Sequence, residues 1–200
     1  MTQETTQGPD GFAFTPENLA RAREIIARYP AGKQASAVMP LLDLAQRQHG
    51  GWLPGAAMDY VAEFLEMPPV RVYEVATFYT MYNKRPVGAH HIKVCTNIAC
   101  WLRGAEDLMA ALRERRGLDN DETDRDGTYT LSEVECLGAC VNAPVMQVND
   151  DYYEDLDADS ARAVVEALGR GEAPAPGSRT GRQGSAPEGG PTVLTGKGEG

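Results

Sequence analysis

Hydrophobic residues in the first half of the chain recur at the spacing of amphipathic helices. Four such patterns lie in close succession between residues 15 and 85, and they predict four helices. The first opens at Thr15 and Pro16, a capping residue followed by proline at the first helical position. Because an amphipathic helix buries its apolar face, the four stripes predict one compact helical core. The apolar positions are Leu19, Ala22, Ile26 and Tyr29; Val38, Leu41, Leu42 and Ala45; Met58, Val61, Phe64 and Leu65; and Val72, Val75, Ala76 and Tyr79.

Beyond residue 86 the pattern changes to alternation, which is typical of strands. The residues 149–151 predict the turn of a hairpin, and the acidic stretch 119–126 predicts a solvated loop. The order strand–helix–strand–strand–strand–helix predicts a mixed sheet with helices packed against it and a right-handed first crossover. The expected strands are 91–95, 129–135, 145–148 and 152–154, and the expected helices are 104–116 and one that is capped by Asp157 or Asp159 and ends at Gly169.

The two ends of the chain differ from this body. Residues 1–14 are polar with glycines and predict a flexible arm. Residues 170–200 are rich in glycine and proline with almost no apolar side chains, so they predict an extended tail without a core of its own. The chain therefore divides into an arm (1–14), a helical domain (15–85), a mixed domain (86–169) and a tail (170–200).

The net charge and the N-terminal sequence argue against several classes of function. The net charge of −10 argues against binding to nucleic acid or an anionic membrane surface, which both need clustered Lys and Arg, and suits docking onto a basic protein. The N-terminal stretch MTQETTQGPDGF has no signal-peptide pattern, and no apolar run is long enough to span a bilayer. We expect a soluble intracellular protein whose contact with a membrane comes through a partner.

All four cysteines lie in two short segments of the mixed domain. Cys95 and Cys100 form a C-x4-C pair, and Cys136 and Cys140 form a C-x3-C pair. Each pair follows a predicted strand, so neighbouring strand ends would bring the four thiols to one edge of the sheet. In a reducing compartment such a set is better explained by metal than by disulfides.

The spacing of the cysteines favours an iron–sulfur cluster over other sites. Structural zinc sites usually use two-residue gaps, whereas gaps of four and three residues can wrap a two-iron cluster. The small residues Ala99, Gly138 and Ala139 would let backbone N–H groups approach the sulfurs. Tetrahedral zinc remains an alternative, as do disulfides or dithiol catalysis, although neither pair is the C-x-x-C of thioredoxin-type redox sites.

The cysteine framework, with the sequence Val134-Glu-Cys-Leu-Gly-Ala-Cys-Val-Asn-Ala-Pro144, resembles the thioredoxin-like [2Fe–2S] ferredoxin family. Upstream, Glu74-Val-Ala-Thr-Phe-Tyr-Thr-Met-Tyr82 is similar to the end of the helical domain in one branch, the E subunits of NADH:quinone oxidoreductase (respiratory complex I). The resemblance covers about residues 15–170. It implies an α+β fold, with a helical N-terminal domain and a thioredoxin-like [2Fe–2S] domain containing a mixed sheet. It also implies that one cluster is ligated by Cys95, Cys100, Cys136 and Cys140.

The same resemblance implies a function. The chain would be an electron-transfer subunit of an oxidoreductase and translocase, exchanging one electron with the FMN of a partner subunit that also binds NADH. It would have no catalytic side chains of its own. It would lie on the cytoplasmic or organelle-matrix side of an energy-transducing membrane, peripherally through the other complex I subunits. The alternatives are the equivalent subunit of an NAD-linked hydrogenase or formate dehydrogenase, and a zinc-stabilised interaction module.

Some further side chains carry expectations of their own. His90 and His91 are expected to be surface residues at a strand edge, since four cysteines already complete a ligand set. Trp101, which directly follows Cys100, is expected to be a packing residue that shields the cluster from water. Asp150 and Asp151 are expected within about 10 Å of the cluster, where their charges would lower its reduction potential.

Two more features are expected, and the first of them follows from the resemblance. Thioredoxin-like folds often place a cis-proline beside their active loop, so the Ala143–Pro144 peptide is expected to be cis. The tail is expected to extend over the flavin-bearing subunit, with Val193 and Leu194 as its apolar anchor, because an acidic body is a poor anchor for a few basic residues.

Overall fold

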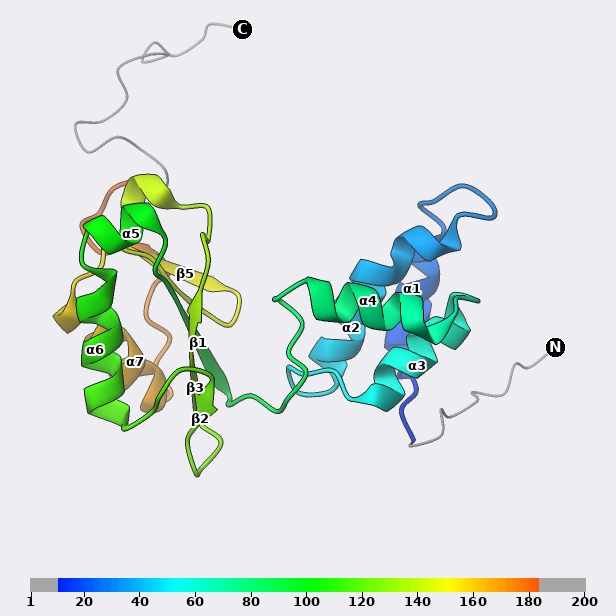
Figure 1. The fold of residues 1–200 in the computed structure, drawn as a ribbon, viewed down its shortest axis with the longest axis horizontal. Coiled ribbons are helices and arrows are strands. Elements are labelled where there is room, and N and C mark those ends of the chain that lie inside the picture. Colours follow the sequence, from blue (N-terminus) through cyan, green and yellow to red (C-terminus); the bar gives the residue numbers. More distant parts are fainter. Residues whose placement is uncertain (1–10, 184–200) are drawn as a thin grey trace, which may run out of the picture. The chain divides into compact units, whose positions relative to one another are not determined.

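The computed structural model describes residues 11–183, without the side chains of residues 115 and 116. The chain divides between Val87 and Gly88 into two compact units (Figure 1). The N-terminal unit contains α1 (Pro16–Ile26), the short 3-10 helix η1 (Gln34–Ala37), α2 (Val38–Gln48), α3 (Gly55–Phe64) and α4 (Pro69–Phe78). The C-terminal unit contains β1 (His90–Cys95), α5 (Ile98–Leu102), α6 (Ala105–Arg116), β2 (Glu122–Thr123), β3 (Tyr129–Val134), the 3-10 helix η2 (Cys140–Asn142), β4 (Met146–Val148), β5 (Asp151–Glu154), α7 (Ala158–Gly169) and β6 (Gly177–Ser178). Within residues 11–183, no helix has the length and apolar character of a membrane-spanning segment.

The N-terminal unit confirms the four helices predicted from hydrophobic periodicity. At the start of α1, Thr15 accepts a hydrogen bond from the Asn18 N–H at 3.2 Å, and Pro16 occupies the first turn. The predicted apolar stripes of α2 and α3 are buried in one core, but the stripe of α4 ends early. Tyr79 is 39% exposed because the helix ends at Phe78 and the chain turns extended there.

The residues just before α1 belong to the helical core and do not form a free arm. Phe12 and Phe14 are buried, and their rings pack edge-on against Tyr60 with centroids 5.6 and 5.3 Å apart. The flexible arm expected for 1–14 is therefore wrong for residues 11–14, whereas residues 1–10 lie outside the described part of the chain. Two aromatic residues bury enough apolar surface to hold a short polar segment in place.

The C-terminal unit is built on the mixed sheet that the sequence predicted. Its strand order is β2-β3-β1-β4-β5-β6. β1 runs parallel to β3 and β5 runs parallel to β6, while the other neighbouring pairs are antiparallel. Helices α6 and α7 lie side by side against the sheet (Figure 1). The buried core between them includes Ile92, Val94, Leu108, Leu112, Leu131, Met146, Val164 and Val165.

Elements that hydrophobic periodicity did not predict are short. The acidic loop expected at 119–126 contains β2, which pairs antiparallel with β3. Two-residue strands such as β2 and β6 contain no measurable alternation, so a local pattern cannot identify them. The cap of α7 is Asp157 rather than Asp159, because Asp157 exchanges hydrogen bonds with Ser160 in a capping box.

The beginning of the C-terminal tail folds onto the sheet. β6 pairs with β5, and the Tyr153 hydroxyl donates to the carbonyl of Pro174 at 3.3 Å. Arg182 forms an ion pair with Asp155. The expectation that the acidic body would not anchor this segment is therefore wrong up to residue 183. The segment is held by backbone pairing with β5 and by one partly buried ion pair, and not by weak ion pairs on the surface. Val193 and Leu194 lie outside the described residues.

His91 is buried, and the expectation that it would be a surface residue is wrong. It is 7% exposed, and its Nε2 lies 2.9 Å from the hydroxyl oxygen of Ser132. The residue it contacts is distant in the sequence, since Ser132 belongs to the neighbouring strand β3. Burial, reinforced by the charge of Lys93, lowers the pKa of His91 from 6.5 to about 4.

A His91→Gln substitution is expected to remove one component of the acid sensitivity of folding. In the unfolded chain this imidazole is protonated near its ordinary pKa of about 6.5, whereas in the folded chain its pKa is lowered to about 4, so it stays neutral until then. The free energy of unfolding should therefore fall by about 2 kcal/mol between about pH 7.5 and pH 5 from this residue alone. Urea unfolding of the wild type, H91Q and the neighbouring control H90Q at both pH values measures this component. Equal pH dependence in the wild type and H91Q would contradict it.

Candidate metal centre

Parallel pairing of β1 with β3 brings the two cysteine pairs to the same edge of the sheet. Cys95 is the last residue of β1 and lies opposite Val134, the last residue of β3. Cys136 follows two residues later, and η2 begins at Cys140. The sequence-based placement of both loops at one edge is thus seen in the structure.

The first pair is buried. Cys95 and Cys100 are each 2% exposed and pack with Ala105, Ala139, Ala143 and Val145. The Cys95 N–H donates to the Val145 carbonyl at 3.1 Å, which ties the end of β1 to the segment before β4. After Cys95 the chain forms α5, which contains Cys100, instead of a plain loop, and Asn97 caps this helix by accepting from the Ile98 N–H at 3.0 Å.

The second pair is exposed and its thiols are adjacent. The sulfurs of Cys136 and Cys140 are 3.3 Å apart. Gly138 has a φ of 84°, a left-handed conformation that glycine adopts without strain, and its N–H points at Cys136 Sγ from 3.4 Å. The expected approach of a backbone N–H to a sulfur is therefore present at Gly138. The Ala143–Pro144 peptide is cis, as predicted.

The thiols influence one another electrostatically across both pairs. Burial, followed by a hydrogen bond with Cys95, raises the pKa of Cys100 to about 12, and the charge of Cys140 adds to the rise. The hydrogen bond from Gly138 lowers the pKa of Cys136, whereas that of Cys140 is raised by its hydrogen bond with Cys136. The two pairs therefore influence one another through Cys140, whose charge acts on Cys100 and which is itself affected by Cys95.

The donor set consists of two thiol pairs. Within residues 11–183, no group of at least three His, Cys, Asp or Glu side chains is placed as the ligand set of a metal ion. The sulfurs are arranged pairwise instead, Cys95 with Cys100 and Cys136 with Cys140. A two-iron cluster takes two thiolates on each iron, so a pairwise set of four cysteines fits it.

Two acidic residues that contact the segment after Cys95 were not singled out from the sequence. Glu135 accepts a hydrogen bond from Asn97 at 2.6 Å, and Glu133 accepts one from Thr96 at 2.8 Å. The charge of Glu135 also raises the pKa of Cys136, although stronger effects lower it overall. The one feature of the local sequence that could have indicated a role for Glu135 is its position directly before Cys136.

Asp150 and Asp151 do not lie where they were expected. Asp151 pairs with Val148, which in turn pairs with Ile92. Ile92 precedes Cys95 by three residues, or roughly 10 Å along the strand, and β5 is a further two strands to the side. The expectation that these acids sit within about 10 Å of the cluster is wrong, because the hairpin turn lies toward the opposite end of β1.

Large apolar side chains beside the cysteines face solvent. Trp101 is 52% exposed, so it is not a buried packing residue of the chain. Ile98 and Leu102 on the same helix are also exposed, as is Val141 in η2, which packs against α5. Exposed apolar residues gathered at one place are typical of a surface that meets another protein.

Comparison with known proteins places the chain in a family. A family model described as thioredoxin-like [2Fe–2S] ferredoxin matches residues 22–169. The E subunit of NADH-quinone oxidoreductase from Rickettsia bellii (strain RML369-C) is 55% identical over 157 residues, which cover 78% of this chain and 94% of the relative. The protein of the same name from Rickettsia conorii (strain ATCC VR-613 / Malish 7) is 56% identical over 157 residues, with the same coverage.

A solved structure shares the fold. The NAD+-reducing [NiFe]-hydrogenase in its H2-reduced state superposes with a TM-score of 0.56 at 20% identity. The match covers 68% of this chain but 23% of the hydrogenase chain. The family model and the two relatives show that this chain belongs to the thioredoxin-like [2Fe–2S] ferredoxin family, in the branch formed by the E subunits of NADH-quinone oxidoreductase.

Proposed function

We propose that Cys95, Cys100, Cys136 and Cys140 ligate one [2Fe–2S] cluster, and that the chain exchanges single electrons with the FMN of a partner subunit that oxidises NADH. The observation that carries this proposal is the meeting of two thiol pairs at one sheet edge. All-cysteine ligation is the usual mode for such clusters. Membership in the family and in the oxidoreductase branch supports it.

The residues of the site have distinct tasks in this proposal. When bound, the cluster supplies reversible one-electron chemistry. Burial of Cys95 and Cys100 keeps water away from one side of the site, while exposure of Cys136 and Cys140 leaves the other side open to a redox partner. The Gly138 N–H stabilises negative charge on the Cys136 sulfur.

The exposed apolar residues around the cysteines support a partner that docks at this edge. Ile98, Leu102 and Val141 flank the site, and interface cores are depleted of charge and enriched in large apolar side chains. We place the flavin-bearing subunit there, and we place the chain at the membrane periphery through that partner and the rest of the complex. NADH and FMN would be bound by the partner.

Metal analysis and spectroscopy test the proposal directly. The purified chain should contain two irons and two labile sulfides, be brown-red when oxidised, and give a low-temperature EPR signal after reduction with dithionite. A colourless protein with one zinc and no labile sulfide would overturn the proposal in favour of a zinc-stabilised interaction module.

The fold shared with NAD+-reducing hydrogenase supports a second candidate, the equivalent subunit of such an enzyme. It is the weaker candidate, because relatives above half identity are NADH-quinone oxidoreductase subunits whereas the hydrogenase match is 20% identical. Affinity purification separates the two, since co-purification with a nickel-containing subunit would favour the hydrogenase.

Glu135→Gln is expected to raise the reduction potential of the site. A carboxylate about 10 Å from a cluster opposes reduction by roughly 1.7 kcal/mol at an effective dielectric of about 20, which corresponds to about 70 mV. Glutamine keeps the hydrogen bond with Asn97 while removing the charge. EPR-monitored redox titration of E135Q measures the shift, with D150N as a control at the distant hairpin. A shift in D150N as large as that in E135Q would contradict the assignment.

A further inference from the structure

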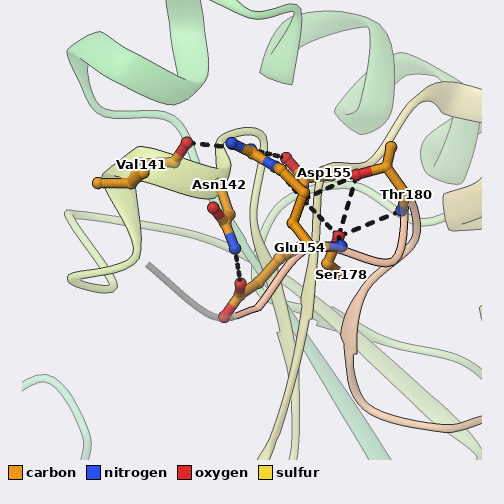
Figure 2. A network of polar contacts seen from close by, with 7 residues as sticks. Val141, Asn142, Glu154, Asp155, Ser178 and Thr180 are labelled. Carbon is orange, nitrogen blue, oxygen red and sulfur yellow. Dashed lines mark hydrogen bonds and ion pairs between the residues drawn. The ribbon is translucent and has the colours of Figure 1, made fainter. Parts of the chain in front are cut away.

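The chain beyond α7 reaches the segment that contains the second cysteine pair. β6 places Ser178 opposite Glu154, and the chain then continues past the end of β5. Figure 2 shows the polar contacts made there, which join η2, the residues at the end of β5 and the segment 178–182. These three segments are far apart in the sequence.

Asp155 is the centre of these contacts. Its carboxylate accepts hydrogen bonds from Ser178 Oγ at 2.6 Å, Thr180 Oγ1 at 3.3 Å and Arg182 Nε at 3.2 Å. Arg182 Nη2 makes a second contact with the same carboxylate, so the pairing is two-pronged. The side chain of Asp155 is 6% exposed and that of Arg182 is 18% exposed. Burial raises the pKa of Asp155, but the hydrogen bonds from Arg182 and Ser178 lower it below its ordinary value.

The same guanidinium contacts the cysteine loop. Arg182 Nη2 donates to the carbonyl oxygen of Val141 at 3.1 Å, and Val141 directly follows Cys140. The next residue, Asn142, is fully buried; its side-chain amide donates to Glu154 at 2.6 Å, and its carbonyl accepts from the Asp155 N–H at 2.8 Å. Consecutive peptide groups after Cys140 are therefore anchored to the end of β5 and to Arg182.

Arg179 offers an internal comparison. Its guanidinium lies 5.8 Å from the centroid of the Tyr153 ring and donates to the Ala175 carbonyl at 3.2 Å. These contacts fasten the returning segment to β5, whereas those of Arg182 extend to the residue after Cys140. Two arginines three residues apart thus have separable contacts.

We propose that Asp155 and Arg182 form a clip that positions Cys140 as a cluster ligand, so that the segment 177–182 belongs to the cluster site. The inference rests on the proposed ligation by the four cysteines. Cys140 lies on an exposed turn, and the direction of its thiolate depends on how the backbone of 140–142 is held. The clip holds that backbone without adding net charge, because its two side chains carry opposite charges. Arg182 is a positioning residue in this scheme and Asp155 orients it.

Opposite charge changes test the clip. Arg182→Gln leaves the Asp155 carboxylate uncompensated and should lower the reduction potential, whereas Asp155→Asn leaves the guanidinium uncompensated and should raise it. Both variants should speed amide hydrogen exchange at Asn142 and Ala143 by roughly tenfold to a hundredfold, the factor for losing a hydrogen bond to a charged group. Both should also release iron to a chelator faster than the wild type. Arg179→Gln removes the same charge without touching Val141, so it is the matched control and should leave loop exchange and iron retention unchanged.

Two truncations of the full chain provide an independent measurement. Ending the chain after Gln183 keeps the clip and should preserve wild-type exchange and iron retention, whereas ending it after Gly171 removes the clip and should reproduce the faster loop exchange of R182Q. If R182Q and D155N both keep wild-type loop exchange and iron retention, the clip is overturned while the cluster stands. A wild-type chain without iron and labile sulfide overturns the proposed function and the clip with it.

Discussion

Cys140→Ala should leave the purified chain with almost no iron or labile sulfide and no EPR signal after reduction. Three thiolates leave one iron a ligand short, and alanine offers no donor. Cys140 Sγ lies 3.3 Å from Cys136 Sγ, so its loss also removes the partner of that thiol. Because the free energy of metal binding is also folding free energy, the C-terminal unit should unfold at a lower urea concentration than the wild type.

Val141→Ala is the matched control for this experiment. Its side chain is 52% exposed and the substitution keeps the backbone carbonyl that Arg182 contacts. V141A should therefore retain iron, sulfide and the EPR signal. A C140A protein with wild-type iron, sulfide and EPR signal would show that Cys140 is not a ligand.

Phe14→Ala should reduce the free energy of unfolding of the helical unit by about 3–5 kcal/mol, the usual cost of removing a large aromatic side chain from a core. Phe14 is 2% exposed, and its ring packs edge-on against Tyr60 at 5.3 Å and Phe64 at 6.0 Å. Alanine leaves a cavity among these rings, which the surrounding helices can close only in part.

Phe78→Ala makes the same chemical change at an exposed position. Phe78 is 78% exposed at the end of α4, so its removal should change the free energy of unfolding by no more than about 0.5 kcal/mol. Urea unfolding followed by far-UV circular dichroism compares the two variants. Equal losses in F14A and F78A would show that residues 11–14 do not pack on the core in solution.

Long periodic segments were predictable because their signal is local. Each helix from α1 to α4 repeats its apolar residues over several turns, and the adjacent residues Thr15 and Pro16 indicate the start of α1. The location of the cysteine pairs was equally predictable. Each pair follows a strand, and parallel pairing of β1 with β3 brings the two loops to the same edge of the sheet. The fold class and the meeting of the cysteines therefore followed from the sequence.

Errors arose where burial depends on residues distant in the sequence. His91 alternates like a surface residue, yet it is buried and its imidazole lies against Ser132 of β3. Phe12 and Phe14 lie in a polar stretch and become core residues through Tyr60, far along the chain. Glu135 rather than Asp150 lies near the thiols because strand register, not acidic density, sets those distances.

The sequence by itself determined the two-part α+β architecture, the order of the main helices and strands, and the set of four cysteines, since these depend on local periodicity and spacing. The tertiary structure alone decided that the tail returns to β5 and that Arg182 and Asp155 meet beside Cys140. Asp155 and Arg182 are separated by 27 residues, and nothing in either local sequence indicates the other. Only chain folding can pair such residues, because a desolvated ion pair forms where the backbone brings two opposite charges together.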